Sequence, residues 1–199
     1  MNRNYYKALF LSALLLLSLV HCGTDAGTDP ATREGVLEPE AGSPEASLTF
    51  APPEEWSEQN PGPMRRAQYQ LASGEPGVED AEVAVFFFQG GGGGTIQANL
   101  DRWTGQFTTD GAPTETKGEV SKSEVNGLPL TILDISGTYR PAMGMMSTGE
   151  PRPNYRMIAA IVETQAGPWF FRLTGPEATV GRWEESFRSF LQTVKPVEV

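Results

Sequence analysis

Hydrophobic and polar residues follow two different periods along residues 48–199, and each period predicts a different kind of element. In 64–71 apolar and polar residues alternate, which predicts a strand with one exposed face. The segment 81–89 is apolar on both faces near its end, which predicts a central strand. Asn126-Gly127 predicts a tight type I′ turn between two strands. The other predicted strands are 48–50, 115–125, 128–139, 155–164 and 169–173.

Two segments carry apolar residues at helical spacing, and each is predicted to be an amphipathic helix. The first follows the glycine run 90–94, and its apolar face consists of Ile96, Leu100, Trp103 and Phe107. The second begins after Gly175-Pro176, because proline is favoured in the first turn of a helix. Its apolar face consists of Val180, Trp183, Phe187, Phe190, Leu191 and Val194.

The predicted order of elements is therefore β-β-β-α-β-β-β-β-α, with hairpins between most strands. We expect an α+β domain, with a largely antiparallel sheet of about six to seven strands and two amphipathic helices packed on it. All four Trp and nine of the ten Phe lie in 48–199. Because about 150 residues are enough for one core, we expect a single domain there.

Residues 1–22 have a different pattern. A positive start, with Arg3 and Lys7, is followed by an uncharged, Leu-rich run over 8–20. This run is shorter than the roughly 18–20 residues that span a membrane, and it is typical of a signal peptide. It ends in Leu19-Val20-His21-Cys22, which resembles the lipobox of bacterial lipoproteins. The resemblance implies that 1–21 is removed and that Cys22 carries a lipid; the alternative is an ordinary signal peptide with an incidental cysteine.

The segment 22–47 is predicted to be a disordered, acidic tether. From Gly23 to Ser47 it contains no aromatic residue, and its only basic residue is Arg33. Its six acidic residues are Asp25, Asp29, Glu34, Glu38, Glu40 and Glu45. Such a composition cannot bury enough apolar surface to offset the entropy of ordering. A flexible chain of this length reaches on the order of 25–30 Å, which would hold the folded domain just clear of a membrane.

Composition and charge argue against several classes of function. The chain has one histidine and one cysteine, His21 and Cys22, and both lie at the predicted cleavage site. Residues 48–199 therefore cannot form a Ser-His-Asp triad, a Cys-His dyad or a Cys/His zinc site. The net charge of −10 argues against a nucleic-acid partner, because phosphate binding needs clustered Lys and Arg. We expect a protein that is not an enzyme, with no catalytic residue, cofactor or metal.

Two short motifs of the region 48–196 are Ala51-Pro52-Pro53-Glu54-Glu55-Trp56 and Phe170-Phe171-Arg172-Leu173-Thr174-Gly175-Pro176. They resemble the PsbP-like fold, an α/β/α sandwich. The chain also resembles uncharacterised bacterial lipoproteins through Gly93-Gly94, Asn99, Arg102-Trp103 and Gln106-Phe107. The resemblance implies an accessory or binding role, because proteins of this fold are mainly non-catalytic.

Asn99, Arg102 and Gln106 are the candidate contacts for a ligand or partner, because they lie near one another beside the apolar face of the first helix. A solvated helix face or a structural bridge to a loop is the alternative. The glycine run 90–94 has backbone amides that suit an anion at a helix start, or it is only a flexible turn. Trp56, in a proline-rich loop, is expected to plug the core; the alternative is an exposed contact residue.

Two further groups suggest chemistry. Met143, Met145 and Met146 offer soft thioether ligands for Cu(I), or else an adaptable contact surface. Asp134 and Glu163 lie in predicted strands, and a pair of neighbouring carboxylates would suit acid–base work. The alternative is that they are exposed edge charges or form ion pairs with Arg140, Arg156 or Arg172.

Together these features favour a lipid-anchored, non-catalytic lipoprotein of the cell envelope that acts as an accessory or binding module. Its expected partners are the membrane, through lipid on Cys22, and an envelope protein, with the domain outside the cytoplasm and the outer membrane preferred. A copper- or anion-binding periplasmic protein using the methionine loop and a carboxylate-based hydrolase are the alternatives.

Overall fold

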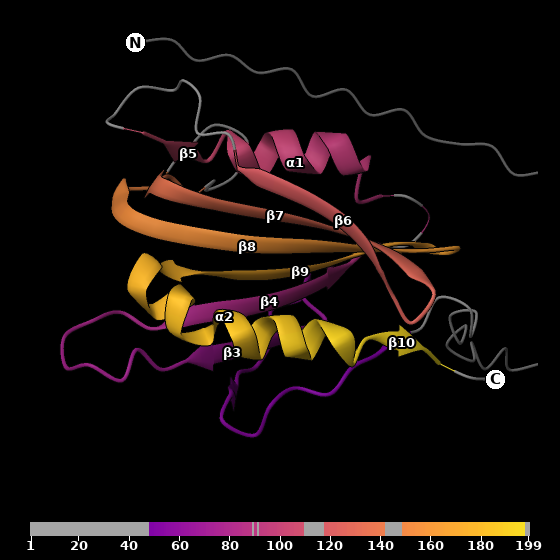
Figure 1. Ribbon diagram of the computed structural model, residues 1–199, viewed down its shortest axis with the longest axis horizontal. Helices are drawn as coiled ribbons and strands as arrows, with labels where there is room; N and C mark the ends of the chain where they lie inside the picture. Colours follow the sequence, from indigo (N-terminus) through magenta and orange to yellow (C-terminus); the bar gives the residue numbers. More distant parts are fainter. Residues whose placement is uncertain (1–47, 89, 91, 110–117, 142–148, 198–199) are drawn as a thin grey trace, which may run out of the picture. The chain divides into compact units, whose positions relative to one another are not determined.

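The computed structural model describes residues 48–88, 90, 92–109, 118–141 and 149–197. In this part of the chain two helices, α1 (Ile96–Thr104) and α2 (Glu177–Gln192), are set among strands (Figure 1). The strands are β1 (Leu48–Thr49), β2 (Ser57–Glu58), β3 (Ala67–Leu71), β4 (Ala81–Phe87), β5 (Phe107–Thr108), β6 (Glu119–Val125), β7 (Leu128–Tyr139), β8 (Arg152–Thr164), β9 (Gly167–Pro176) and β10 (Lys195–Pro196).

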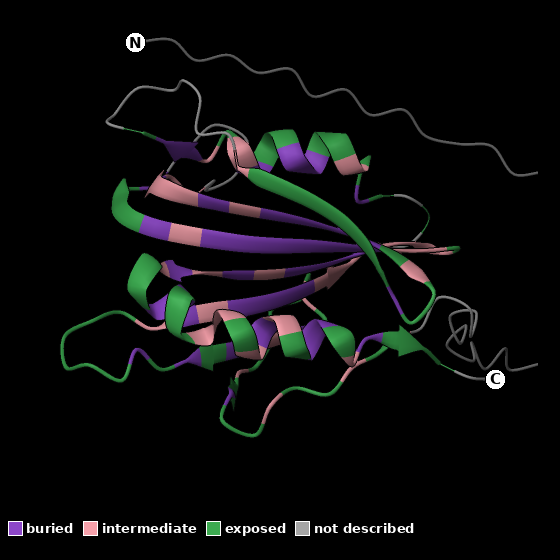
Figure 2. Cartoon of the chain, in the orientation of Figure 1, coloured by how far each residue is buried: buried purple, intermediate pink, exposed green. Residues whose placement is uncertain are grey.

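The main sheet of the described residues has eight strands in the order β2-β3-β4-β9-β8-β7-β5, and β6 also pairs with β7. Every pairing in it is antiparallel, so the expected α+β class with a largely antiparallel sheet is confirmed. The main sheet has more strands than expected because β2 and β5 have two residues each, too few to show a period. β6 is exposed over most of its length, whereas β8 is largely buried (Figure 2).

The sheet separates two hydrophobic cores. The larger core lies under α2 and contains alternate residues of β3, β4, β8 and β9, such as Val83, Ile158 and Phe171. The smaller core lies under α1 and contains the intervening residues, such as Met157 and Phe170. Alternation along each strand therefore directs every second side chain to one helix. Figure 1 shows α1 at the top and α2 below, with β7, β8 and β9 between them.

Helix α1 begins where Thr95 caps it, because the Thr95 hydroxyl accepts a hydrogen bond from Ala98 N. Leu100 and Trp103 are buried as the periodicity predicts. The predicted helical position of Phe107 is wrong: the helix ends at Thr104, before Gly105, and Phe107 pairs with Tyr139 in the sheet. Glycine is a poor helix former, and this allows the chain to turn into β5 there.

Helix α2 buries four of its predicted apolar residues, Val180, Phe187, Phe190 and Leu191, and Trp183 packs against the same core. Trp56 is buried as expected, 4.9 Å from the ring of Phe190 between centroids. Its indole Nε1 donates to Ser186 Oγ at 3.1 Å, so Trp56 fastens the loop before β2 onto α2. The described residues include no helix that is both long enough and apolar enough to cross a membrane.

The β6–β7 hairpin turns at Asn126-Gly127, where both residues have positive φ, 47° and 79°. This confirms the predicted turn, because type I′ needs positive φ at both central positions. The Asn126 amide also donates to the carbonyl oxygens of Gln192 and Val194, at 3.0 and 2.7 Å. The hairpin is therefore tied to the end of α2.

Candidate functional site

Strand β9 changes from apolar to polar side chains on the face that α1 covers. Phe170, Arg172 and Thr174 alternate with residues of the larger core, so all three belong to the α1 face. Phe170 packs against Trp103 of α1, with ring centroids 5.9 Å apart. Arg172 and Thr174 line a cavity instead. Along β9, the side chains on this face therefore change from the smaller core to the lining of a polar cavity.

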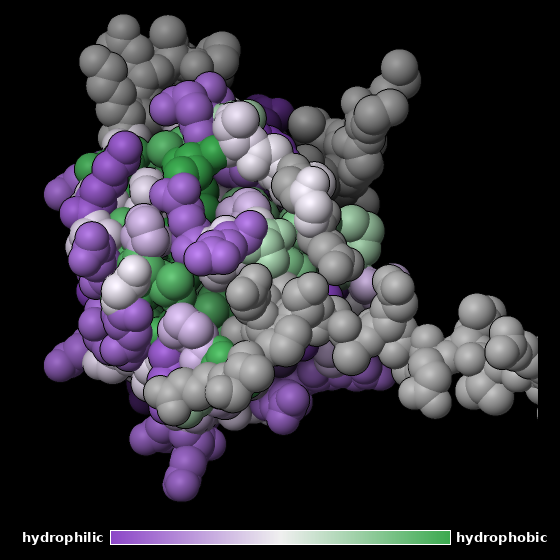
Figure 3. Space-filling model, turned by 90° about the vertical axis from the view of Figure 1, so that its right-hand side faces the viewer, coloured by the Kyte–Doolittle hydropathy of each residue, from purple (hydrophilic) through white to green (hydrophobic). Residues whose placement is uncertain are grey.

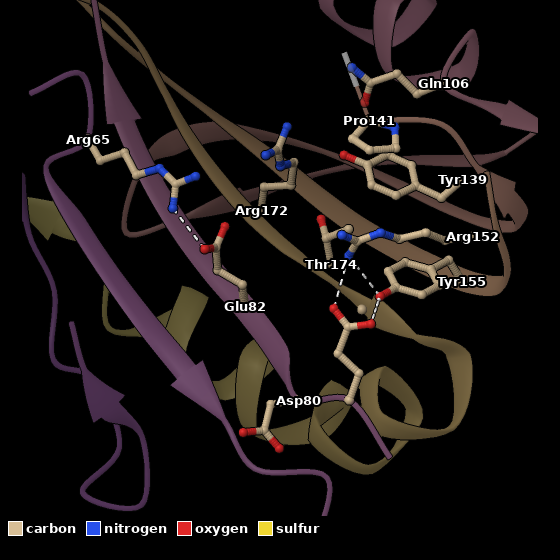
Figure 4. A pocket seen from close by; sticks show the side chains of 12 residues that line it. Arg65, Asp80, Glu82, Gln106, Tyr139, Pro141, Arg152, Tyr155, Arg172 and Thr174 are labelled. Atoms are coloured by element: carbon tan, nitrogen blue, oxygen red, sulfur yellow. Dashed lines mark hydrogen bonds and ion pairs between the residues drawn. The ribbon is translucent and has the colours of Figure 1, made fainter. Parts of the chain in front are cut away.

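Two neighbouring pockets share Arg65, Gln106 and Arg172 as lining residues, and we treat them as two lobes of one cavity. We call the first the polar lobe; it measures about 350 Å³, and its further lining residues include Glu79, Asp80, Glu82, Tyr139, Arg152, Tyr155 and Thr174. We call the second the aromatic lobe; it measures about 370 Å³, and its further lining residues are Phe86, Phe88, Arg102, Trp103 and Phe170. Figure 4 shows the polar lobe, with side chains from β4, β7, β8 and β9 around Arg172.

Most charged side chains of the polar lobe are paired with an opposite charge. Arg65 Nη1 lies 2.9 Å from Glu82 Oε2, and Arg152 Nη1 lies 2.9 Å from Glu79 Oε1. The Tyr155 hydroxyl donates to Glu79. Burial, and then the hydrogen bond to Glu79, raises the pKa of Tyr155, so this hydroxyl is protonated at neutral pH. These contacts hold the rim of the lobe in a fixed and largely neutral arrangement.

Arg172 differs from these neighbours. Among the described residues no carboxylate lies within ion-pair distance of its guanidinium, and its buried Nε has no hydrogen-bond partner. No dashed line reaches Arg172 in Figure 4. Burial lowers the pKa of Arg172; attraction by Tyr139 and Glu82 opposes this, and repulsion by Arg65 and Arg102 adds to it. The side chain is a partly buried cation without a counter-ion in the described part of the chain.

Two more buried polar atoms at this cavity lack a partner within the described residues, Gln106 Oε1 and Thr174 Oγ1. Buried polar atoms in native proteins are nearly always paired with protein, water or a ligand. The Arg172 Nε–H and the Thr174 hydroxyl can therefore donate to a ligand, whereas Gln106 Oε1 is an acceptor and would pair with a hydroxyl or N–H group of the ligand. Arginine donors bind carboxylates and phosphates in strong, charge-assisted hydrogen bonds, so the arrangement suits an anion.

The three residues predicted as contacts have different roles. Asn99 is buried and structural, because its amide donates to the carbonyl oxygens of Gly93 and Thr95, each at 2.8 Å. Arg102 donates to Asn99 Oδ1 and also lines the aromatic lobe. Gln106 lines both lobes. The structure thus brings two of the three residues to the cavity and makes the third a bridge to the glycine loop.

Arg172 and Thr174 were not predicted as site residues; Arg172 was expected to belong to a fold motif or to pair with an acid. The sequence feature that could have revealed them is that they lie two and four residues after Phe170, on the same face of an otherwise apolar strand. That spacing shows that the three share a face, but it does not show that α1 leaves part of this face uncovered.

The predicted proximity of Asp134 and Glu163 is wrong. Asp134 lies opposite Ile158, on the α2 side of the sheet, and Glu163 lies five residues after Ile158, on the other face. Five residues of strand separate their positions by about 16 Å. Asp134 instead accepts two hydrogen bonds from Arg156, at 2.8 and 2.7 Å. The pair therefore cannot serve as the two carboxylates of a hydrolase.

The glycine run between β4 and α1 is described in part, without Gly91. A Cβ at Gly93 would lie 2.7 Å from Cε2 of Phe170, so glycine is needed for the loop to approach the smaller core. Because Thr95 caps the helix and Asn99 holds the loop, a structural turn accounts for these residues.

Several predicted features lie outside the described residues. They are the signal peptide 1–21, lipid attachment at Cys22, the tether 22–47, and the methionines Met143, Met145 and Met146. Within the described ranges, no group of three or more His, Cys, Asp or Glu side chains is placed to hold a metal ion.

Exposed apolar residues do not mark a second site on the described surface. The large ones are Met64, Val78, Val120 and Val197, which lie in different segments. Single exposed apolar residues of this kind are normal. In Figure 3 purple hydrophilic residues cover much of the described surface on the left and below, with smaller green patches between them. The cavity is therefore the strongest candidate site in the described part of the chain.

No family model matches the chain, and no curated protein matches it. Solved structures of similar shape exist. A Pseudomonas aeruginosa protein of unknown function, described as a putative regulator, has a TM-score of 0.47 and 13% identity over 76% of this chain and 99% of that chain. Cyanobacterial PsbP (CyanoP) from Synechocystis has a TM-score of 0.40 and 12% identity over 82% of this chain and 100% of that chain.

A Bacteroides thetaiotaomicron protein has a TM-score of 0.39 and 12% identity over 77% of this chain and 49% of that chain. Scores at this level carry no inference about function. The α+β class follows from the strand order and helix positions of the chain itself.

Proposed function

We propose that the chain is a non-catalytic binding module of the cell envelope, held at a membrane by lipid on Cys22, and that its folded domain binds an anionic ligand at Arg172. The observation that carries the binding function is the uncompensated guanidinium of Arg172 beside the unpaired hydroxyl of Thr174. An unpaired, partly buried cation costs stability. Native proteins retain such costly groups mainly where function requires them.

The composition of the domain supports binding without catalysis. Residues 48–199 contain no histidine or cysteine, and the raised pKa of Tyr155 keeps the hydroxyl of this cavity residue protonated. The Leu19-Val20-His21-Cys22 motif and the acidic composition of 22–47 support the lipid anchor and tether. A tethered domain of this kind samples ligands or partners near the membrane surface without crossing it.

Inorganic phosphate tests the anion site, because it carries charge without an apolar body. We expect the midpoint of thermal unfolding of the full chain to rise with phosphate concentration in a chloride buffer of constant ionic strength, since a ligand that binds only the folded state stabilises it. Arg172→Gln should abolish this rise. Arg66→Gln is the matched control, because Arg66 is exposed and lies over Phe87, which packs against the other core.

An equal rise in wild type and in Arg172→Gln would show that phosphate acts elsewhere and would contradict the proposal. A rise lost in both variants would indicate a general effect of charge, with the same consequence.

A further inference from the structure

The aromatic lobe has a composition that selects among anions. We infer that the ligand of this cavity is a small organic anion with a flat apolar ring, its charge at Arg172 and its ring in the aromatic lobe. This inference rests on the proposed anion site and adds the chemical class of the ligand.

Charge favours an anion in the aromatic lobe. Its described lining contains three arginines and no acid. Arg65 is paired with Glu82, whereas Arg102 donates to the neutral amide oxygen of Asn99 and Arg172 has no carboxylate partner among the described residues. Two guanidinium groups therefore face one lobe without compensation. A bound carboxylate would relieve their repulsion and complete their hydrogen bonding.

The wall beside these cations is aromatic. The guanidinium carbons of Arg65 and Arg172 lie 5.8 and 5.7 Å from the ring centroid of Phe86. Phe88 stacks with Phe86 at 6.4 Å and an interplanar angle of 8°, and Phe170 lies 6.0 Å from Phe88. Phe86 and Phe88 are only partly buried, so ring surface remains for a ligand. A flat ring would pack against these faces by offset or edge contacts.

Size restricts the ligand further. Each lobe, at about 350 and 370 Å³, is near the lower end of the roughly 300–1,000 Å³ range of small-molecule sites. The two lobes meet at Arg172, Arg65 and Gln106. A single ring system bearing one acidic group therefore suits the cavity, with the acid at the shared residues and the ring towards Phe88.

Three probes separate the two parts of the inference: naphthoate carries a ring and a charge, naphthamide carries the ring alone, and acetate carries the charge alone. Isothermal titration of the purified full chain measures each affinity. We expect naphthoate to bind roughly 10- to 100-fold more tightly than either other probe, since a charged hydrogen bond and a buried ring each contribute on this scale. Arg172→Gln should remove the advantage of naphthoate over naphthamide, and Arg66→Gln should preserve it.

The outcomes distinguish this inference from the proposed function. If phosphate stabilises the protein through Arg172 but naphthoate binds no more tightly than acetate, the inference is wrong and the anion site stands. If naphthamide binds as tightly as naphthoate while phosphate still acts through Arg172, the inference is again wrong and the anion site stands. If neither phosphate nor naphthoate binds, both are wrong. Thermal unfolding of Arg172→Gln, measured in parallel, shows that the variant is folded.

Discussion

Replacing Arg172 with methionine is expected to stabilise the ligand-free domain. Most substitutions of partly buried residues do the opposite. The expectation follows from the missing counter-ion, since the guanidinium has no carboxylate partner in the described chain and its Nε is unpaired. Methionine keeps an unbranched apolar stem of similar reach and removes the charge.

The magnitude follows from two opposing contributions. Leaving a buried donor unsatisfied costs about 1–3 kcal/mol, which the substitution removes. The contact of Arg172 with the ring of Phe86, at 5.7 Å, contributes about 0.5–1 kcal/mol, which the substitution loses. The net gain in the free energy of unfolding is about 0–2.5 kcal/mol. At roughly 2–4 °C per kcal/mol for a domain of this size, the unfolding midpoint should rise by up to about 10 °C.

Urea unfolding followed by tryptophan fluorescence, together with calorimetry, measures both quantities without added anions. The contrasting variant is Arg156→Met. Arg156 is also partly buried, but its guanidinium lies 2.7 Å from Asp134 and 2.8 Å from Glu184. Its removal leaves Asp134 and Glu184 with Arg188 as their one cationic partner among the described residues and should lower stability.

The reasoning is refuted if Arg172→Met loses stability as Arg156→Met does. That result would mean that Arg172 has a structural role within the folded domain. A gain in stability together with lost phosphate binding would identify Arg172 as a residue kept for its ligand.

Two further predictions concern the α2 side of the sheet and the anchor. Burial raises the pKa of Glu184, but hydrogen bonds and ion pairs with Arg188 and Arg156 outweigh burial and lower it overall. Glu184→Gln should therefore lower the free energy of unfolding by about 0.5–1 kcal/mol in urea at neutral pH. The difference from wild type should vanish as the pH falls below about 4.5 and through the lowered pKa of Glu184 in the folded state. An equal loss of stability at acidic pH would contradict this role of the Glu184 charge. Cys22→Ser should move the protein from the membrane to the soluble fraction on centrifugation, whereas Thr24→Ala should not; unchanged partitioning would disprove the lipid anchor.

The sequence predicted the long elements well because their periods extend over many residues. β7 has the predicted bounds, 128–139, and the turn at Asn126-Gly127 has the predicted backbone. β5 and β10 were missed because two residues show no period. Phe107 has the spacing of a residue on the apolar face of α1, but it lies in β5, where it pairs with Tyr139 of β7.

The site was harder to predict because it depends on which elements become neighbours. Arg102 and Gln106 were recognised from their position beside an apolar helix face, and both reach the cavity. Arg172 became visible only once β4 and β8 were placed beside β9. Sequence alone does not tell whether an arginine finds an acid across the sheet. Here Glu82, which attracts Arg172, is already paired with Arg65.

The pairing of β1 with β10 has a mechanical consequence. Only two residue pairs join these strands, Leu48 with Pro196 and Thr49 with Lys195. Tension transmitted along the chain that precedes residue 48 would load this short ladder before it reached the eight-stranded sheet. The next contacts along the chain include those of Phe50 with Phe190 and of Trp56 with Ser186. Both belong to the α2 side, so the larger core would resist the pull on the face of the sheet opposite the cavity.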